Sequence, residues 1–396
     1  MSSRCCDMAA IAKPQQQSLQ SSLAAITARM RSTILRALTS RALVDRRHVT
    51  CAIASADAKI VQVDNPARLV VTDAVLHAVL AAFDGKLSDG DVVLTNDPFS
   101  GGTHLQDATL VTPIFLRKKL VGYGIAQVPL ADIGGQSLGG YYPFALEIWA
   151  EGVRVTPVKF YRGRQIQRDA LTMLLLNSRL PHLIEKDVEI VVGVLNQCKT
   201  DVKSLVTQYT TADYTREVQD LLADTEAQAR RAIQTFAFGK GYGQSVPIHS
   251  CLEEKEFRVV TRLSIVDGTV RIDFSDTSPT AKGFINATAT TTKAAALMPF
   301  LGLWPSLFVN SGLLSVFSCV IPEGSLLNAK VPQSVGWSVY EPSLTVAYGI
   351  DAHIQQAQLA YVSVPQVTNT FSPPALPFMI TGCGRPGCPF PSLPRA

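Results

Sequence analysis

Cysteine is scarce in this chain, and its spacing does not suit metal binding. Only eight cysteines occur among 396 residues. They are Cys5, Cys6, Cys51, Cys198, Cys251, Cys319, Cys383 and Cys388. No pair has the CxxC spacing of zinc and redox sites, and the CxxxxC of the last two is weak evidence for either. This scarcity excludes a disulfide-stabilised secreted scaffold, and we expect a cytoplasmic protein with reduced thiols.

Runs of like charge are also missing. Charged residues make up 17% of the chain, with 36 Lys and Arg against 32 Asp and Glu. The pI of about 8.6 therefore comes from scattered residues, which excludes a basic surface for nucleic acid. Hydrophobic residues reach 47%, which excludes intrinsic disorder. At about 150 residues per domain, the length predicts two to three domains.

Motifs that bind phosphate or form a hydrolytic nucleophile are absent. The sequence has no GxxxxGK followed by Ser or Thr, no GxGxxG after a strand, no GxSxG and no HExxH. We therefore expect no ATP site in this chain. The first residues, MSSRCCDMAAIAKPQQQ, contain no continuous apolar segment, so no secretory signal is expected.

One long uncharged stretch raises the question of a membrane span. No charged residue lies between Lys293 and Glu323, and this length would cross a bilayer. Pro299 and Pro305 would interrupt a single helix. We expect a buried helix followed by a core strand, and no membrane insertion.

Local patterns predict alternating helices and strands. Apolar residues recur every three or four positions in 18–43 and 168–238, which indicates helices. Thr72 is the expected N-cap of a helix in TDAVLHAVLAAF. The segments DVVLTNDP, ATLVTPIFL and KLVGYGIAQV are rich in β-branched residues and indicate consecutive strands. Asp267 and Gly268 between two alternating segments predict a hairpin.

These patterns predict an α+β fold with two β-rich layers separated by a helical region. The expected regions are an N-terminal tail at 1–17, an α+β region with a candidate metal loop at 18–165, a helical region at 166–250, a β-rich region at 251–365 and a Pro/Gly-rich tail at 366–396.

The densest group of polar residues is NDPFSGGTHLQD, between two predicted strands. His104 and Asp107 place an imidazole and a carboxylate three residues apart, which is half of a metal site. Asp132 is the ionisable residue expected to complete the site, with Gln127 as an alternative ligand. In the competing interpretation, Asn96 and Asp97 cap a turn and His104 binds a carboxylate without metal.

The other histidines are expected to be isolated surface or packed residues. They are His48, His77, His182, His249 and His353.

Five ordered segments carry a resemblance to a known family. They are NDPFSGGTHLQDATLVTPIF, ADIGG, EGVRVTPVK, RIDFSDTSPTAKGFINAT and IPEGSLLNAKVP. In this order and spacing they resemble the B subunits of the hydantoinase/oxoprolinase family, over roughly residues 15–350. That family includes N-methylhydantoinase, 5-oxoprolinase and caprolactamase subunits, and it is related to acetone and acetophenone carboxylases.

The resemblance implies a subunit of an ATP-dependent enzyme that opens cyclic amides such as hydantoin, 5-oxoproline or a lactam. An A-type partner would bind ATP and phosphorylate the substrate, and the two chains would form a hetero-oligomer. Alternatives are a ketone carboxylase subunit that uses bicarbonate, and a shortened, non-catalytic relative that only binds its partner. The proline-rich tail, which does not resemble the family's remaining part, and Pro129, which offers no side-chain ligand, favour the last.

The resemblance also implies a divalent metal of the Mn, Zn or Fe type. His104 and Asp107 match two ligand positions of the acetone carboxylase relatives, whose third ligand is a later histidine. Pro129 occupies that third position here and offers no side-chain ligand. We nevertheless expect Pro129 to lie close to His104 at the edge of the sheet.

Overall fold

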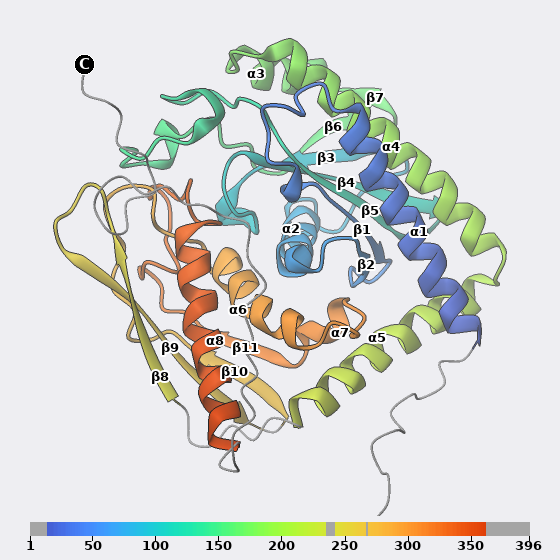
Figure 1. Ribbon diagram of the computed structural model, residues 1–396. Coiled ribbons are helices and arrows are strands. Elements are labelled where there is room, and N and C mark those ends of the chain that lie inside the picture. The colour runs from blue at the N-terminus through green and yellow to red at the C-terminus, as the bar shows by residue number, and fades with distance from the viewer. Residues whose placement is uncertain (1–13, 235–241, 267, 362–396) are drawn as a thin grey trace, which may run out of the picture.

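The computed structural model describes residues 14–234, 242–266 and 268–361. It contains two β-sheets with helices packed around them (Figure 1). The described helices are α1 (Pro14–Ala37), α2 (Leu69–Ala82), α3 (Arg168–Leu176), α4 (Pro181–Thr207), α5 (Thr211–Gln234), α6 (Ala289–Leu303), α7 (Ser311–Leu314) and α8 (Glu341–Tyr361). The described strands are β1 (Thr50–Ser55), β2 (Ile60–Val63), β3 (Val92–Thr95), β4 (Asp107–Leu116), β5 (Lys119–Pro129), β6 (Val158–Arg162), β7 (Gln165–Ile166), β8 (Tyr242–His249), β9 (Glu256–Val266), β10 (Thr269–Asp273) and β11 (Phe317–Val320).

The first sheet is antiparallel, with strand order β2-β1-β5-β4-β3-β6-β7. Helices α1 and α4 lie side by side over one face (Figure 1), and α2 packs against the other. Neighbouring residues of a strand point to opposite faces, so Leu110 joins the core under α1 and α4 while Val111 joins the core under α2. Burial on both faces explains the nearly continuous apolar runs of these strands.

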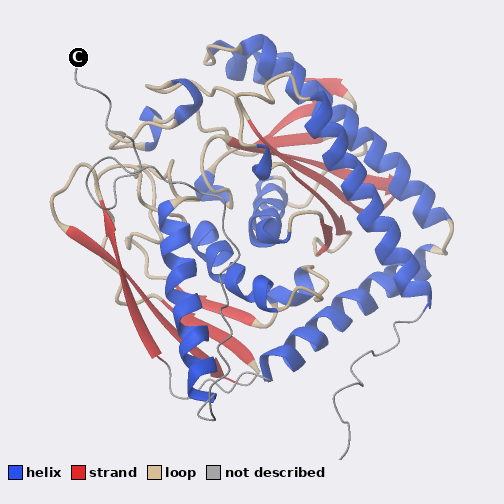
Figure 2. Cartoon of the chain, in the orientation of Figure 1, coloured by secondary structure: helices blue, strands red, loops and turns tan. Residues whose placement is uncertain are grey.

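The second sheet has the order β11-β10-β9-β8, with β10 and β11 parallel. Helix α8 packs against β8 and β9, and α6 packs against α8 (Figure 2). Residues of β9 alternate between buried and exposed, as expected for a sheet with one open face. Val266 pairs with Thr269, which confirms the predicted hairpin; Asp267 of its turn lies outside the described residues.

The helices α3, α4 and α5 follow the first sheet in the chain, and α5 contacts both β2 and β10. The predicted α+β class with two β-rich layers and an intervening helical region is thus confirmed. The expected helical region 166–250 is nevertheless not wholly helical, because its last residues form β8. β8 pairs over its whole length with Glu256–Leu263 of β9, and this pairing decides the conformation of its residues. The expected tail 366–396 lies outside the described residues.

The uncharged stretch after Lys293 divides into the rest of α6, α7 and β11. The expected buried helix is confirmed by α6, but the expected core strand is wrong, because β11 is a partly buried strand at the edge of the second sheet. Pro299 lies inside α6 without ending it, and the helix ends at Leu303, before Pro305. No helix among the described residues is both long enough and apolar enough to span a membrane.

The prediction that Thr72 caps a helix is wrong. Helix α2 already begins at Leu69, directly after a 3-10 turn at Pro66–Arg68. The Thr72 hydroxyl donates a hydrogen bond to the carbonyl of Arg68 at 2.8 Å, from a position inside the helix.

Candidate metal centre

The loop 96–106 joins β3 to β4 and is held by its own polar side chains. The Asn96 amide donates a hydrogen bond to the carbonyl of Leu105 at 2.8 Å. Asp97 caps a 3-10 turn, where its carboxylate accepts from the backbone N–H of Phe99 at 3.0 Å. The capping role considered for Asp97 is therefore confirmed, whereas Asn96 caps no turn and instead binds the backbone of Leu105, Val153 and Val155. Together these contacts fix the path of the loop that carries His104.

Three potential metal ligands meet where this loop enters β4. Among the described residues, His48, His104 and Asp107 each offer one ligand atom, and these atoms all lie within 4.8 Å of one another. His48 Nδ1 is 3.1 Å from Asp107 Oδ1, and His104 Nδ1 is 3.4 Å from Asp107 Oδ2. The predicted pair is thus brought together, and a second imidazole joins it.

The expectation that His48 is isolated is wrong. His48 ends a short 3-10 turn before β1. Thr50 of β1 and Thr109 of β4 both pair with Gln127 of β5, which lies between them. His48 and Asp107 each precede one of these threonines by two residues, so the register brings them to one edge of the sheet. Predicting the register of β1 against β5 would have shown that His48 lies close to Asp107.

The structure also corrects the placement of Asp132, which does not join the cluster. Its carboxylate accepts from the backbone N–H groups of Gly139 at 3.1 Å and Arg179 at 2.6 Å. The Arg179 guanidinium adds an ion pair at 2.9 Å. Asp132 is committed to these contacts and holds the loops around it, so it does not replace the missing third ligand.

Pro129 lies directly opposite Asp107 in the β4–β5 ladder, and this places it at the candidate centre as expected. Directly opposite residues of antiparallel strands have Cα atoms roughly 4.5–5.5 Å apart and side chains on the same face. Gln127 also faces this ladder, where its amide donates to Thr109 Oγ1 at 3.2 Å.

Asp107 is buried and lies beside a permanent positive charge. The Arg68 guanidinium forms an ion pair with Oδ2, and the Thr103 hydroxyl donates to the same oxygen at 3.1 Å. Burial alone would raise the pKa of the Asp107 carboxyl, but Arg68 and the two imidazoles outweigh it and hold this pKa well below its usual range. Asp107 is therefore a carboxylate at neutral pH.

His104 is fully buried and oriented by contacts on both ring nitrogens. Its Nε2 is 3.1 Å from the Tyr141 hydroxyl, and its Nδ1 is 3.0 Å from Thr103 Oγ1. Burial lowers the pKa of His104 to about 3, although Asp107 acts in the opposite direction. The imidazole is therefore neutral at neutral pH, which is the form that binds metals.

Aromatic side chains from the C-terminal half form a wall beside the cluster. Tyr340 and Trp337 stack with ring centroids 4.3 Å apart, and Tyr340 lies 6.1 Å from the His48 ring. The hydroxyls of Tyr340 and Tyr141 are 3.2 Å apart. The sequence pattern did not point to these residues, because they are remote from the loop in sequence and carry no motif.

The buried carboxylate of Glu151 anchors the segment that carries this wall. Oε1 accepts from the Ser334 hydroxyl and from the backbone N–H of Gly336 at 2.7 Å. Burial raises the pKa of Glu151 to about 7, although hydrogen bonds from Ser334, Val335 and Gly336 lower it.

Replacing Glu151 with Gln is expected to remove a pH dependence of stability. The ordinary pKa of 4.5 rises to about 7 on folding, so the folded state binds the proton more tightly. The free energy of unfolding should therefore fall by about 2.5 kcal/mol through this group as the pH rises from about 5 to 8. Urea unfolding at both pH values measures this. Equal pH dependence in the two proteins would contradict the assignment.

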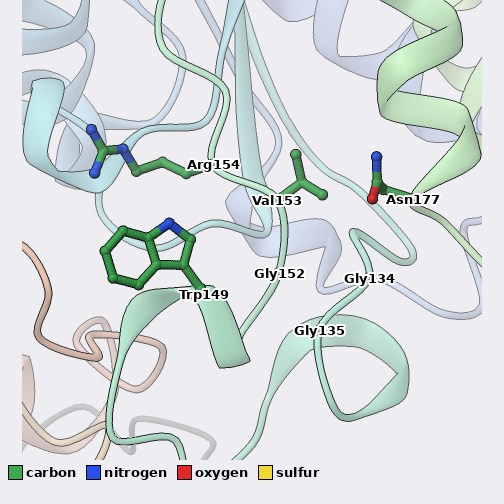
Figure 3. Close-up of a pocket in the computed structure, with 7 residues that line it drawn as sticks. All are labelled: Gly134, Gly135, Trp149, Gly152, Val153, Arg154 and Asn177. Atoms are coloured by element: carbon green, nitrogen blue, oxygen red, sulfur yellow. The ribbon is translucent and has the colours of Figure 1, made fainter.

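A cavity of about 400 Å³ lies beside the Gly134–Gly135 turn. Figure 3 shows Trp149 and Arg154 on one side of it and Asn177 on the other. Arg154 Nε lies 3.3 Å from a carboxylate oxygen of Asp97, so the cavity adjoins the loop that carries His104. Its volume suits a small molecule.

Comparison with known proteins assigns this chain to a family. The family described as Hydantoinase B/oxoprolinase matches residues 15–367. The chain belongs to this family. The resemblance predicted from the five segments is thereby confirmed.

Two named relatives show how much of this family the chain covers. The caprolactamase subunit beta of Pseudomonas jessenii is 26% identical over 71% of this chain and 49% of its own length. The 5-oxoprolinase 1 of Arabidopsis thaliana is 25% identical over 76% of this chain and 26% of its own. The chain thus spans about half or less of the length of these relatives.

Solved structures share the fold. The ATP-dependent caprolactamase of Pseudomonas jessenii matches with a TM-score of 0.81 and 24% identity, over 88% of this chain and 61% of that one. Nucleotide-free acetone carboxylase matches with a TM-score of 0.76 and 16% identity, over 85% of this chain and 46% of that one.

Proposed function

We propose that this hydantoinase B/oxoprolinase chain is a subunit of an ATP-dependent hydrolase that opens cyclic amides, with an A-type partner that binds ATP. The cluster of His48, His104 and Asp107 carries this proposal, because it lies inside the region that matches the family. A relative named as a subunit beta supports a hetero-oligomer. The free cysteines Cys51, Cys198, Cys251 and Cys319 support a cytoplasmic site of action.

The donor set suits a divalent ion of the Mn, Zn or Fe type. Two imidazoles and one carboxylate are common ligands of such ions. Neutral His104 and ionised Asp107 have the protonation states that metal binding requires. Arg68 contacts one carboxylate oxygen of Asp107, while the other faces His48. An ion held by these residues would supply a Lewis acid at the reacting amide.

The residues around the cluster orient it and limit access of solvent. Tyr141 contacts His104 Nε2, which leaves Nδ1 directed at Asp107. Tyr340 covers one side of His48, and Trp337 packs against Tyr340. The cavity of about 400 Å³, which is linked to the loop that carries His104 by the contact of Arg154 with Asp97, is large enough for a hydantoin, 5-oxoproline or lactam ring.

The chemistry divides between two chains in this proposal. Transfer of a phosphoryl group to the amide oxygen by the partner turns a poor electrophile into one that water attacks. The absence of a phosphate-binding motif here is consistent with that division. We expect no ATP binding by this chain alone in calorimetry, and measurable binding by the two-chain complex.

The activity test uses this chain purified together with its A-type partner. ATP is supplied with a hydantoin, 5-oxoproline or caprolactam, and in parallel reactions with acetone or acetophenone. ADP, ring-opened product and carboxylated product are measured with and without bicarbonate. Formation of ring-opened product that depends on ATP and on both chains supports the proposal. Carboxylation that requires bicarbonate would assign a ketone carboxylase instead, and absence of turnover with every ring would support a non-catalytic relative.

Replacing Pro129 with His is expected to strengthen metal binding. Pro129 lies opposite Asp107, so an imidazole there adds a third histidine on the same face of the sheet. The affinity for Zn²⁺ or Mn²⁺ should rise about tenfold or more, as measured by calorimetry. Pro129→Ala serves as the control, because it removes the ring and adds no ligand. No gain over that control would refute the correspondence with the third ligand position.

A further inference from the structure

A second cavity, of about 320 Å³, lies away from the candidate metal centre. One face of α4 lines it together with Asp89 and Gly90 before β3, and with Arg164 in the β6–β7 turn. These elements gather at the upper right of Figure 1. Gly90 precedes β3 whereas the loop with His104 follows it, so the cavity and the candidate centre lie at opposite ends of this strand.

Positive charge dominates the cavity. Lys199, Lys203 and Arg164 line it, and Asp89 is the single acidic residue among the lining residues. Asp89 already pairs with Arg164 at 3.0 Å and lies 3.9 Å from Lys203. One carboxylate does not neutralise three cations, so the cavity keeps a local excess of about two positive charges.

Lys199 is the most buried of the three cations. It is 9% exposed and lines the cavity, and its ammonium has no ion-pair or hydrogen-bond partner among the described residues. Burial lowers the pKa of Lys199, and the neighbouring Lys203 and Arg164 add to this effect, while Asp89 opposes it. The side chain of Lys199 is thus largely buried while its unpaired ammonium faces the cavity, where it is available to a bound anion.

Arg164 reaches the cavity from an unfavourable backbone conformation. Its φ is +73°, in the left-handed region where glycine or asparagine is usual in such a turn. A Cβ at Gly90 would lie 2.5 Å from Arg164 Cγ, so the absence of a side chain at position 90 makes room for the arginine. Strain of this kind concentrates at functional sites.

We propose that this cavity binds the phosphoryl group of a small phosphorylated molecule. Lys199, Lys203 and Arg164 would neutralise the phosphoryl oxygens, and the side-chain amide of Asn196 adds a hydrogen-bond donor in the same lining. The cavity is larger than one phosphate needs, and Tyr161, Val92 and Val192 offer apolar surface for the remainder of the ligand. The site is independent of the proposed ring-opening reaction.

The test is a calorimetric titration of the full chain at constant ionic strength with inorganic phosphate, ribose 5-phosphate and ribose. Inorganic phosphate and ribose 5-phosphate should both bind with a Kd below about 1 mM, and ribose should not bind. Tighter binding of ribose 5-phosphate identifies a phosphorylated molecule as the ligand. Equal binding of both probes overturns that part of the proposal and identifies free phosphate.

Three variants make the test specific. Lys199→Gln and Arg164→Gly should each weaken binding about tenfold or more, because each removes one cation. Arg164→Gly also relieves the backbone strain, so it should fold at least as well as the parent. Lys186→Gln changes an exposed lysine of α4 outside the cavity and should bind normally. Failure of both probes to bind the parent, or equal loss in all three variants, would overturn the proposal.

Discussion

Replacing Asp107 with Ala is expected to lower the free energy of unfolding by about 3–5 kcal/mol. The variant leaves the Arg68 guanidinium in a buried place without its carboxylate, and it removes the partner of His48. The pKa of Asp107 lies well below its usual value in the folded state, so its stabilising contribution is lost only as the pH falls below the ordinary 3.8. Urea unfolding should therefore show a large loss of stability throughout the range from about pH 5 to 8.

A double variant distinguishes loss of this ion pair from a general packing defect. Arg68→Met combined with Asp107→Leu replaces both charged partners with apolar groups of similar size, and it should recover most of the stability lost in Asp107→Ala. If the double variant is as unstable as the single one, the buried charge of Arg68 is not the cause.

Replacing His104 with Ala is expected to remove both the bound divalent ion and the activity of the two-chain enzyme. His104 is fully buried and offers one of three clustered ligand atoms, so its loss leaves two. The ring-opening rate should fall by more than about 100-fold, since even residues behind the ligands contribute 10–100-fold. Metal content is measured by mass spectrometry on purified protein, and folding is followed by circular dichroism.

His77→Ala is the matched control for this substitution. His77 is half exposed on α2 and takes no part in the cluster, so the control should keep parental metal content and activity. Equal metal content in His104→Ala and the parent would exclude the proposed centre, whatever the activity.

Much of the fold could be predicted because its determinants are local. The strands β3, β4 and β5 follow segments rich in β-branched residues and broken by Gly, Pro or Asn, and the β9–β10 hairpin follows alternation around a two-residue turn. Thr72 shows the limit of such reasoning. It is a good capping residue near the start of an apolar helix. The helix nevertheless follows directly on the 3-10 turn at Pro66–Arg68 and begins at Leu69, so Thr72 lies inside it.

The candidate site was only partly visible in the sequence. His104 and Asp107 share one loop, so their spacing alone indicated a pair of ligands. His48 and Arg68 come from separate turns earlier in the chain, and their proximity to Asp107 depends on the order of the strands. Asp132 looked suitable by its position after β5, yet its hydrogen bonds to other loops direct it elsewhere.

The sequence by itself determined the family, the α+β class, the pair His104 and Asp107, and the position of Pro129 beside them. Only the tertiary structure decided that His48 completes the cluster, that Arg68 keeps Asp107 charged, and that an aromatic wall closes one side. The physical reason is that spacing along the chain records neighbours within one strand or loop. Contacts between distant segments arise only when strand register and helix packing bring them together.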